Sequence, residues 1–296
     1  MNKSILRSAI LFLIITTITQ SFSFAQLQRK RANPNAPVEE IFWAPTLIGT
    51  STVSTLSQGD LNFTVQHNFG LVSGGIDNFF GLDDGATVRL AFAYGITDRF
   101  MVNIGRTNNE DIVDLGSTIR LVRQTKSNST PIDIAIRGNV GIATEEIQAF
   151  DADFSDRLSY LASIMFARKF SDDLSLQVSP MFSHFNTVVI SEADRSVEND
   201  HFGVGFVGNY RLNDIVSFSA EYLPVFGKRT DGTINHFGGS LEINTGGHVF
   251  QIFLTSGEFF TEQHLLARTN NDFLDGDFQI GFTINRVFSP GKRKRK

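Results

Sequence analysis

Residues 131–142 read PIDIAIRGNVGI, and apolar side chains occupy every second position of this stretch. The even-numbered positions are apolar except for Gly138: Ile132, Ile134, Ile136, Val140 and Ile142. The odd-numbered positions, which form the opposite parity, are Asp133, Ala135, Arg137, Asn139 and Gly141. Successive side chains of a β-strand point to opposite faces, so the stretch predicts a strand with one apolar and one polar face. Helical spacing does not hold in it for two turns.

The same alternation recurs from residue 61 to the end of the chain. It defines twelve segments, at residues 61–69, 86–94, 99–106, 112–123, 131–142, 157–169, 174–185, 201–211, 215–223, 234–244, 248–256 and 277–288. A tilted strand needs about 9 to 11 residues to cross a membrane, and the segments are close to this length. The pattern therefore predicts transmembrane strands.

The connections between the segments alternate in length. Short turns, such as residues 95–98 and 245–247, alternate with long loops, such as 70–85 and 257–276. The one exception is that the loop at 107–111 is shorter than the turn at 124–130. Outer-membrane barrels have short periplasmic turns and long outer loops. We therefore predict an all-β fold, an antiparallel up-and-down transmembrane β-barrel of about 12 strands, with both ends of the chain in the periplasm.

Composition narrows the possible classes. The chain has 41% hydrophobic residues, 19% charged residues and 29 Phe, yet its mean hydropathy is −0.04, so its apolar surface must alternate with a polar one. The absence of Cys excludes a disulfide scaffold, a thiol nucleophile and a zinc–thiolate site. The formal net charge is −5, and eight basic residues lie at 29–31 and 292–296. The acidic region between them argues against a nucleic-acid partner.

The N-terminus predicts export. Residues 1–25 have the features of a cleaved signal peptide. They begin with a short basic region, continue with an apolar stretch at residues 9–18, and end in small residues at Ala25. We expect residues 26–59 to form a periplasmic N-terminal segment or a plug, 60–288 the barrel, and 289–296 a basic tail. The candidate plug, EEIFWAPTLIGTSTVSTLSQG at 39–59, could fold into the lumen, pair as an extra strand or lie beneath the barrel.

A soluble alternative has the same strand alternation. An exported β-barrel or sandwich that binds a ligand also joins alternating strands by turns. Here the less apolar face carries Gly, Ala, Ser and Asn, which favours a confined polar lumen. The last segment ends on Phe288 with apolar residues at alternate positions and resembles the signal that the barrel-assembly machinery reads. The expected partners are that machinery, outer-membrane lipid and lipopolysaccharide.

Charged side chains on the polar parity are candidates for a functional lumen. They are Arg89, Asp114, Arg120, Asp133, Arg137, Glu221 and Glu242. Arginines on one side and carboxylates on the other would create a field across the lumen, as pore constrictions do for small polar solutes. The alternative is that these groups simply neutralise one another, since a charge outside bulk water must be paired.

Metal and catalytic sites have little support in the sequence. Asp151, Asp153 and Asp156 are possible ligands of a hard cation in an outer loop, but they do not follow the EF-hand order. His236 and Ser240 share a parity, yet residues four apart on a strand are separated by about 13 Å, too far for a proton relay. We expect no cofactor, no metal and no catalytic residue, with an outer-membrane hydrolase as a remote alternative.

Several motifs between residues 66 and 124 carry a resemblance to a known family. They are QHNFG at 66–70, GGIDNFFGLDD at 74–84, YGITDR at 94–99, IGR at 104–106 and IRLVRQ at 119–124. The chain resembles a family of Gram-negative outer-membrane β-barrels that is known only as a domain of unknown function. The resemblance implies fold and location. The expected function is a non-enzymatic outer-membrane barrel that forms a small-solute pore, or alternatively a plugged or structural barrel.

Overall fold

The computed structural model describes residues 33–145, 151–188, 197–230 and 232–290 of the chain. The predicted signal peptide and most of the basic tail lie outside these residues. No helix in the described part is long and apolar enough to cross a membrane. From residue 35 onward, the described residues form one compact unit dominated by β-strands.

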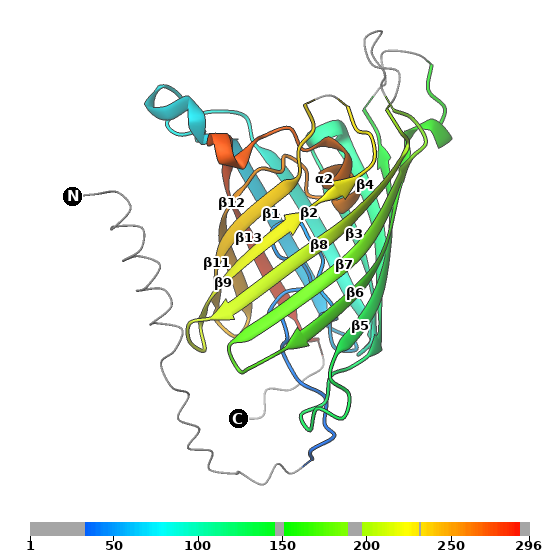
Figure 1. The fold of residues 1–296 in the computed structure, drawn as a ribbon, viewed down its shortest axis with the longest axis vertical. Coiled ribbons are helices and arrows are strands. Elements are labelled where there is room, and N and C mark those ends of the chain that lie inside the picture. The colour runs from blue at the N-terminus through cyan, green and yellow to red at the C-terminus, as the bar shows by residue number, and fades with distance from the viewer. Residues whose placement is uncertain (1–32, 146–150, 189–196, 231, 291–296) are drawn as a thin grey trace, which may run out of the picture. The chain divides into compact units, whose positions relative to one another are not determined.

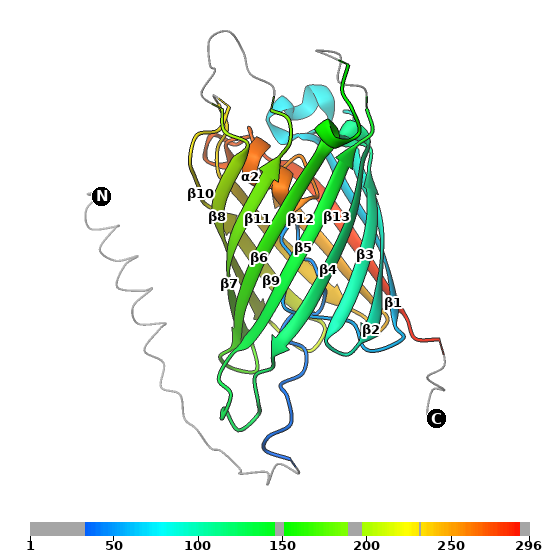
Figure 2. The same cartoon turned by 90° about the vertical axis from the view of Figure 1, so that its right-hand side faces the viewer.

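The described strands form a single antiparallel sheet (Figures 1 and 2). They are β1 (Leu61–Leu71), β2 (Thr87–Thr97), β3 (Phe100–Thr107), β4 (Ile112–Val122), β5 (Asp133–Ala143), β6 (Leu158–Lys169), β7 (Leu174–Phe185), β8 (Asp200–Arg211), β9 (Val216–Leu223), β10 (Val225–Phe226), β11 (His236–Asn244), β12 (His248–Thr255) and β13 (Gln279–Phe288). Each of the twelve predicted segments overlaps one long strand.

The sheet closes on itself. Each long strand pairs with its neighbours in sequence, β1 pairs with β13, and the β8–β9 pairing completes the circle. Closure leaves no unpaired sheet edge among these strands, which is what a lipid environment requires of a β-structure. The predicted antiparallel barrel is therefore confirmed, with β10 as one short extra strand.

The two faces of the barrel wall differ as the alternation predicts. The outer face exposes large apolar side chains, for example Leu90, Phe92 and Ile252 at 48%, 48% and 58%. The inner face is mostly polar, and β1 alone contributes Asn62, Thr64, Gln66 and Asn68, all buried. The outward Phe residues thus account for the apolar content, and the inward polar residues for the near-zero mean hydropathy.

The long loops and the short turns lie at opposite ends of the barrel (Figure 1). The long-loop end carries the helical segments η1 (Val72–Asn78), η2 (Asn109–Asp111), η3 (Ser155–Arg157), α2 (Glu262–Arg268) and η4 (Phe273–Asp275). The sequence did not predict these helices. Each has seven residues or fewer, too short for helical periodicity to show.

Two prolines interrupt the regular ladders. Pro224 separates β9 from β10, which continues the pairing with β8 at Gly203. In the β6–β7 ladder, Ser163 pairs with Met181 and Phe166 pairs with Val178, and the residues between them are not paired. Pro180 lies in this unpaired stretch of β7. Proline has no backbone N–H to donate, so both interruptions follow from the residue type.

The unexpectedly long turn between β4 and β5 has a structural role. It receives the chain before β1, through a bridge between Pro37 and Thr125 and a hydrogen bond from the Val38 N–H to the Gln124 carbonyl at 2.7 Å. The extra turn residues supply backbone partners for this incoming segment. This explains why residues 124–130 do not follow the short-turn rule of their end of the barrel.

Candidate functional site

A loop from the N-terminal region occupies the short-turn half of the barrel interior (Figure 1). We call residues 39–56 the N-terminal insert. Ile41, Leu47 and Val53 in it are at most 1% exposed. A tight turn at its tip is closed by hydrogen bonds from the Leu47 N–H to the Thr50 carbonyl at 3.0 Å and from the Thr52 N–H to the Pro45 carbonyl at 2.8 Å. In the structure, this segment lies against inward-facing side chains of the barrel wall.

Apolar side chains anchor the N-terminal insert to the barrel wall. Ile41, Phe42, Leu47 and Val53 pack on an inward-facing patch formed by Ala135, Met165, Ala167 and Val207. Ile48 packs with Phe253 of β12 and with Phe260 of the loop before α2. The wall is therefore not polar everywhere, and its apolar patch matches the apolar part of the insert.

Hydrogen bonds fix the tip of the insert. The backbone N–H groups of Gly49 and Thr50 donate to the two carboxylate oxygens of Glu221, at 2.8 and 3.1 Å. The Gln177 side chain binds both sides of the tip, accepting from the Val53 N–H at 2.9 Å and donating to the Ser51 carbonyl at 2.8 Å. A buried carboxylate that accepts two backbone N–H groups forms strong, charge-assisted hydrogen bonds.

A second insert enters from the long-loop end. Helix α2 lies inside the mouth of the barrel (Figure 2), and Leu265 and Leu266 pack on a patch formed by Ile112, Leu161, Met181, Leu223 and Phe259. Arg268 forms an ion pair with Glu110 at the rim. Complete burial, together with the positive charge of Arg268, lowers the pKa of His264 well below its ordinary value. The helix therefore docks with a neutral imidazole.

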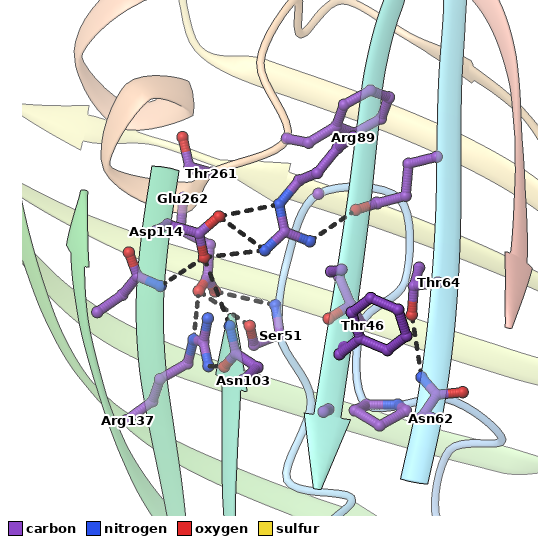
Figure 3. A pocket seen from close by; sticks show the side chains of 18 of the residues that line it. Thr46, Ser51, Asn62, Thr64, Arg89, Asn103, Asp114, Arg137, Thr261 and Glu262 are labelled. Carbon is purple, nitrogen blue, oxygen red and sulfur yellow. Dashed lines mark hydrogen bonds and ion pairs between the residues drawn. The ribbon is translucent and has the colours of Figure 1, made fainter. Parts of the chain in front are cut away.

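The two inserts meet near the middle of the lumen. Glu262 of α2 accepts from the Ser51 N–H and the Ser51 hydroxyl, both at 2.9 Å, and from Arg137 Nε at 2.8 Å (Figure 3). Gly49 lies so close to α2 that a Cβ there would be 2.3 Å from Leu265 Cδ1. The cavity at this junction measures about 40 Å³, enough for a few water-sized molecules and too small for a sugar or an amino acid.

Six of the seven predicted lumen charges are buried, Arg137 is half-buried, and most find partners on nearby strands. Asp114 binds Arg89 at 2.9 Å, and Arg120 pairs with Asp133. Arg137 instead reaches Glu262, a residue that the sequence did not single out. The first two pairs lie within the wall itself, whereas the third joins the wall to α2. Figure 3 shows the Arg89–Asp114 and Arg137–Glu262 pairs.

The two predicted glutamates lie on β9 and β11. Glu221 also contacts His236 Nε2, on the neighbouring strand β11, at 2.7 Å. Residue spacing within one strand could not predict this contact between two strands. Glu242 accepts from the hydroxyl of Ser219 and from Asn209 Nδ2 at 3.2 Å. Neither glutamate forms an ion pair with an arginine within the described chain.

The three loop aspartates do not form a cation site in this structure. Asp151 and Asp153 are exposed, and the Asp156 carboxylate accepts the Asp153 N–H at 2.9 Å. In the described parts of the loops and strands, no three His, Cys, Asp or Glu side chains gather in a way that could hold a metal ion.

Sequence reasoning missed the residues that hold the inserts. The available signal was the inner parity of β6, where Leu161, Met165 and Ala167 stand among serines. Apolar side chains on a face that is otherwise polar indicate that something packs there. Glu262 and Ser51 gave no comparable signal, because their contact joins segments 211 residues apart.

Comparison with solved structures gives matches to outer-membrane barrels. Among them are the NanC porin (TM-score 0.49, 8% identity, 77% of this chain and 97% of that chain) and the KdgM porin (0.45, 8%, 78% and 98%). Another is an outer-membrane channel from Pseudomonas putida F1 (0.48, 13%, 80% and 98%). No curated protein matches the sequence.

A family model provides the sequence-level assignment. The model described as a membrane bound beta barrel domain (DUF5777) matches residues 42–288. The matched region covers all the strands and also most of the N-terminal insert. The chain therefore belongs to this family of membrane-bound β-barrels of unknown function, in agreement with the family resemblance in its motifs.

Proposed function

We propose that the protein is a non-enzymatic outer-membrane pore for small polar solutes, closed in this structure by its two inserts. The observation that carries the proposal is the junction of Ser51 and Glu262, which interrupts a lumen whose wall is mostly polar outside its two apolar patches. A barrel with a purely structural role has no need of such a wall. The predicted lumen charges line the path that a solute would take.

Unpartnered polar atoms on the wall support a hydrated lumen. Among the described residues, the buried hydroxyls of Ser163, Ser183, Ser240 and Thr283 have no hydrogen-bond partner within the protein. Leaving a buried polar group unpaired costs about 1–3 kcal/mol. Such a wall suits contact with water and polar solutes better than permanent contact with a packed core.

We assign lipid as the partner of the exposed outer Phe and Leu side chains, and the barrel-assembly machinery as the partner during biogenesis.

A permanently occluded barrel is the second candidate. It is favoured by the match between the inserts and the two apolar wall patches, around Met165 and around Met181. Burying these side chains stabilises the docked inserts. In this case the protein would act as a membrane component without transport.

Bilayer conductance separates the two candidates. We expect the full mature chain to show a low conductance, and a variant that lacks residues 41–56 and also carries Leu265→Ser and Leu266→Ser to show large, stable steps. Each insert should be changed alone as a matched control, with smaller effects because the other still fills its half of the lumen. Absence of conductance in the doubly altered but folded barrel would exclude the pore.

A further inference from the structure

We propose that the lumen binds small solutes that carry a carboxylate, in the place that the Glu262 side chain occupies in this structure. The inference deepens the proposed pore function and rests on it. It assigns a class of solute to the pore and a site at which that solute competes with helix α2.

The geometry around Glu262 is that of a carboxylate-binding site. Three donors converge on its two oxygens: Ser51 N–H reaches Oε1 at 2.9 Å, while Ser51 Oγ and Arg137 Nε reach Oε2 at 2.9 and 2.8 Å (Figure 3). The Arg137 and Glu262 side chains are 9% and 3% exposed. Charge-assisted hydrogen bonds of this kind are about twice as strong as neutral ones.

Arg137 differs from the other arginines of the same wall region. Arg89 and Arg120 are each neutralised by an aspartate of the wall, and they keep these partners whatever the inserts do. Within the described chain, the ion-pair partner of Arg137 is Glu262 alone, and its Nη1 is held by the neutral Asn103 and Thr118 at 3.0 and 3.4 Å. Departure of α2 therefore leaves an unpaired, pre-oriented guanidinium in the lumen.

The site survives the departure of α2. Ser51 belongs to the N-terminal insert, whose tip is held separately by Glu221 and Gln177. All three donors thus remain in place when the helix leaves, and the space that it vacates opens toward the long loops. A solute from that side then reaches three donors already arranged for a carboxylate.

Competition between a solute carboxylate and Glu262 couples solute binding to the release of α2. A carboxylate that binds only when Glu262 has left stabilises the released state of α2, and it shifts the equilibrium by its differential affinity for the two states. Neutral solutes lack this effect, because they do not satisfy the charge of Arg137. The long-loop half of the lumen would therefore open in response to the solutes that it accepts, while the N-terminal insert stays in place.

Thiol labelling tests the competition, because the chain has no Cys of its own. Ala267 of α2 is buried, so an Ala267→Cys variant, reconstituted in lipid vesicles, should react slowly with a membrane-impermeant maleimide. We expect sodium acetate to raise the labelling rate saturably, by about tenfold relative to sodium chloride at the same ionic strength and pH. Glu262→Gln should raise the rate without acetate, and Arg137→Gln should remove the acetate effect.

A matched control loosens α2 without changing the carboxylate site. Glu110→Gln removes the rim ion pair with Arg268, so it should raise the basal labelling rate and leave the acetate effect intact. If Arg137→Gln does not fold, Ser51→Ala, which loses one of the three donors, should lower the apparent acetate affinity severalfold. Equal rates in acetate and chloride, with α2 mobile in Glu262→Gln, would overturn the proposal. Conductance is measured separately, so a pore without carboxylate competition and a closed barrel give different results.

Discussion

At the scale of single residues, the buried ion pairs are the most sensitive points of the wall. Asp133 is fully buried, pairs with Arg120 and accepts the Gln124 N–H at 3.0 Å. Asp133→Asn leaves the guanidinium uncompensated, so we expect a loss of about 3–5 kcal/mol in the free energy of unfolding. Urea unfolding of the protein in lipid vesicles measures this loss.

The exposed pair at the rim provides the control. Arg106 and Asp111 are 57% and 44% exposed, and solvent screens such pairs, so Arg106→Gln should change the stability by less than about 1 kcal/mol. Similar losses for Asp133→Asn and Arg106→Gln would show that the buried pair contributes no more than a surface one.

His264 makes the docking of α2 depend on pH. Its pKa is lowered in the docked helix, so the released helix takes up a proton more readily, below about pH 6.5. The docking free energy is therefore fully present above that pH and falls by up to about 1.4 kcal/mol for each pH unit below it.

Labelling of Ala267→Cys checks this dependence. Its rate, normalised to that of the exposed Leu274→Cys on the same loop, should rise as the pH falls from about 7.5 to about 5.5. His264→Gln should flatten the profile, because glutamine does not titrate. An unchanged profile in that variant would assign the effect to another group.

At the scale of elements, the strands could be predicted and the inserts could not. The strand signal is local, since alternation along residues such as 131–142 gives both the element and its two faces. β5 accordingly runs from Asp133 to Ala143. The inserts are fixed by contacts between distant segments, for example Gly49 with Glu221, and no periodicity records such contacts. The inward charges were identifiable by parity, whereas the partner of Arg137 was not.

Helix α2 should detach without unfolding the barrel, because the strand ladder closes independently of it. Leu266 is fully buried in the apolar cluster around Met181 inside the barrel, so Leu266→Ala should weaken the docking of α2 by about 2–5 kcal/mol. Trypsin should then cut after Arg268 much faster, while the thermal unfolding of the β-structure changes little. Leu274→Ala, at a 93% exposed position, should have no effect. Joint loss of helix and barrel would mean that α2 belongs to the folding core.

At the scale of the whole molecule, the closed barrel defines which end faces outward. Twelve long strands place the start of β1 and the end of β13 on the short-turn side, and long loops face the exterior in this class of barrel. We expect Leu274→Cys to be labelled on intact cells by an impermeant maleimide, and Asp172→Cys, in the exposed β6–β7 turn, only after the outer membrane is permeabilised. The opposite pattern would reverse the assigned orientation.

The route of the N-terminal insert has a topological consequence. The segment arrives beside the β4–β5 turn at Val38 and returns beside the β2–β3 turn, where the Gly59 N–H donates to the Gly95 carbonyl at 2.8 Å. Both limbs lie at the same rim, so the backbone makes a U-turn inside the barrel and never threads it. A pull from the short-turn side can withdraw the segment as a hairpin with every strand pairing intact. Helix α2 retracts the opposite way, so the barrel can be cleared from both sides without being opened at a seam.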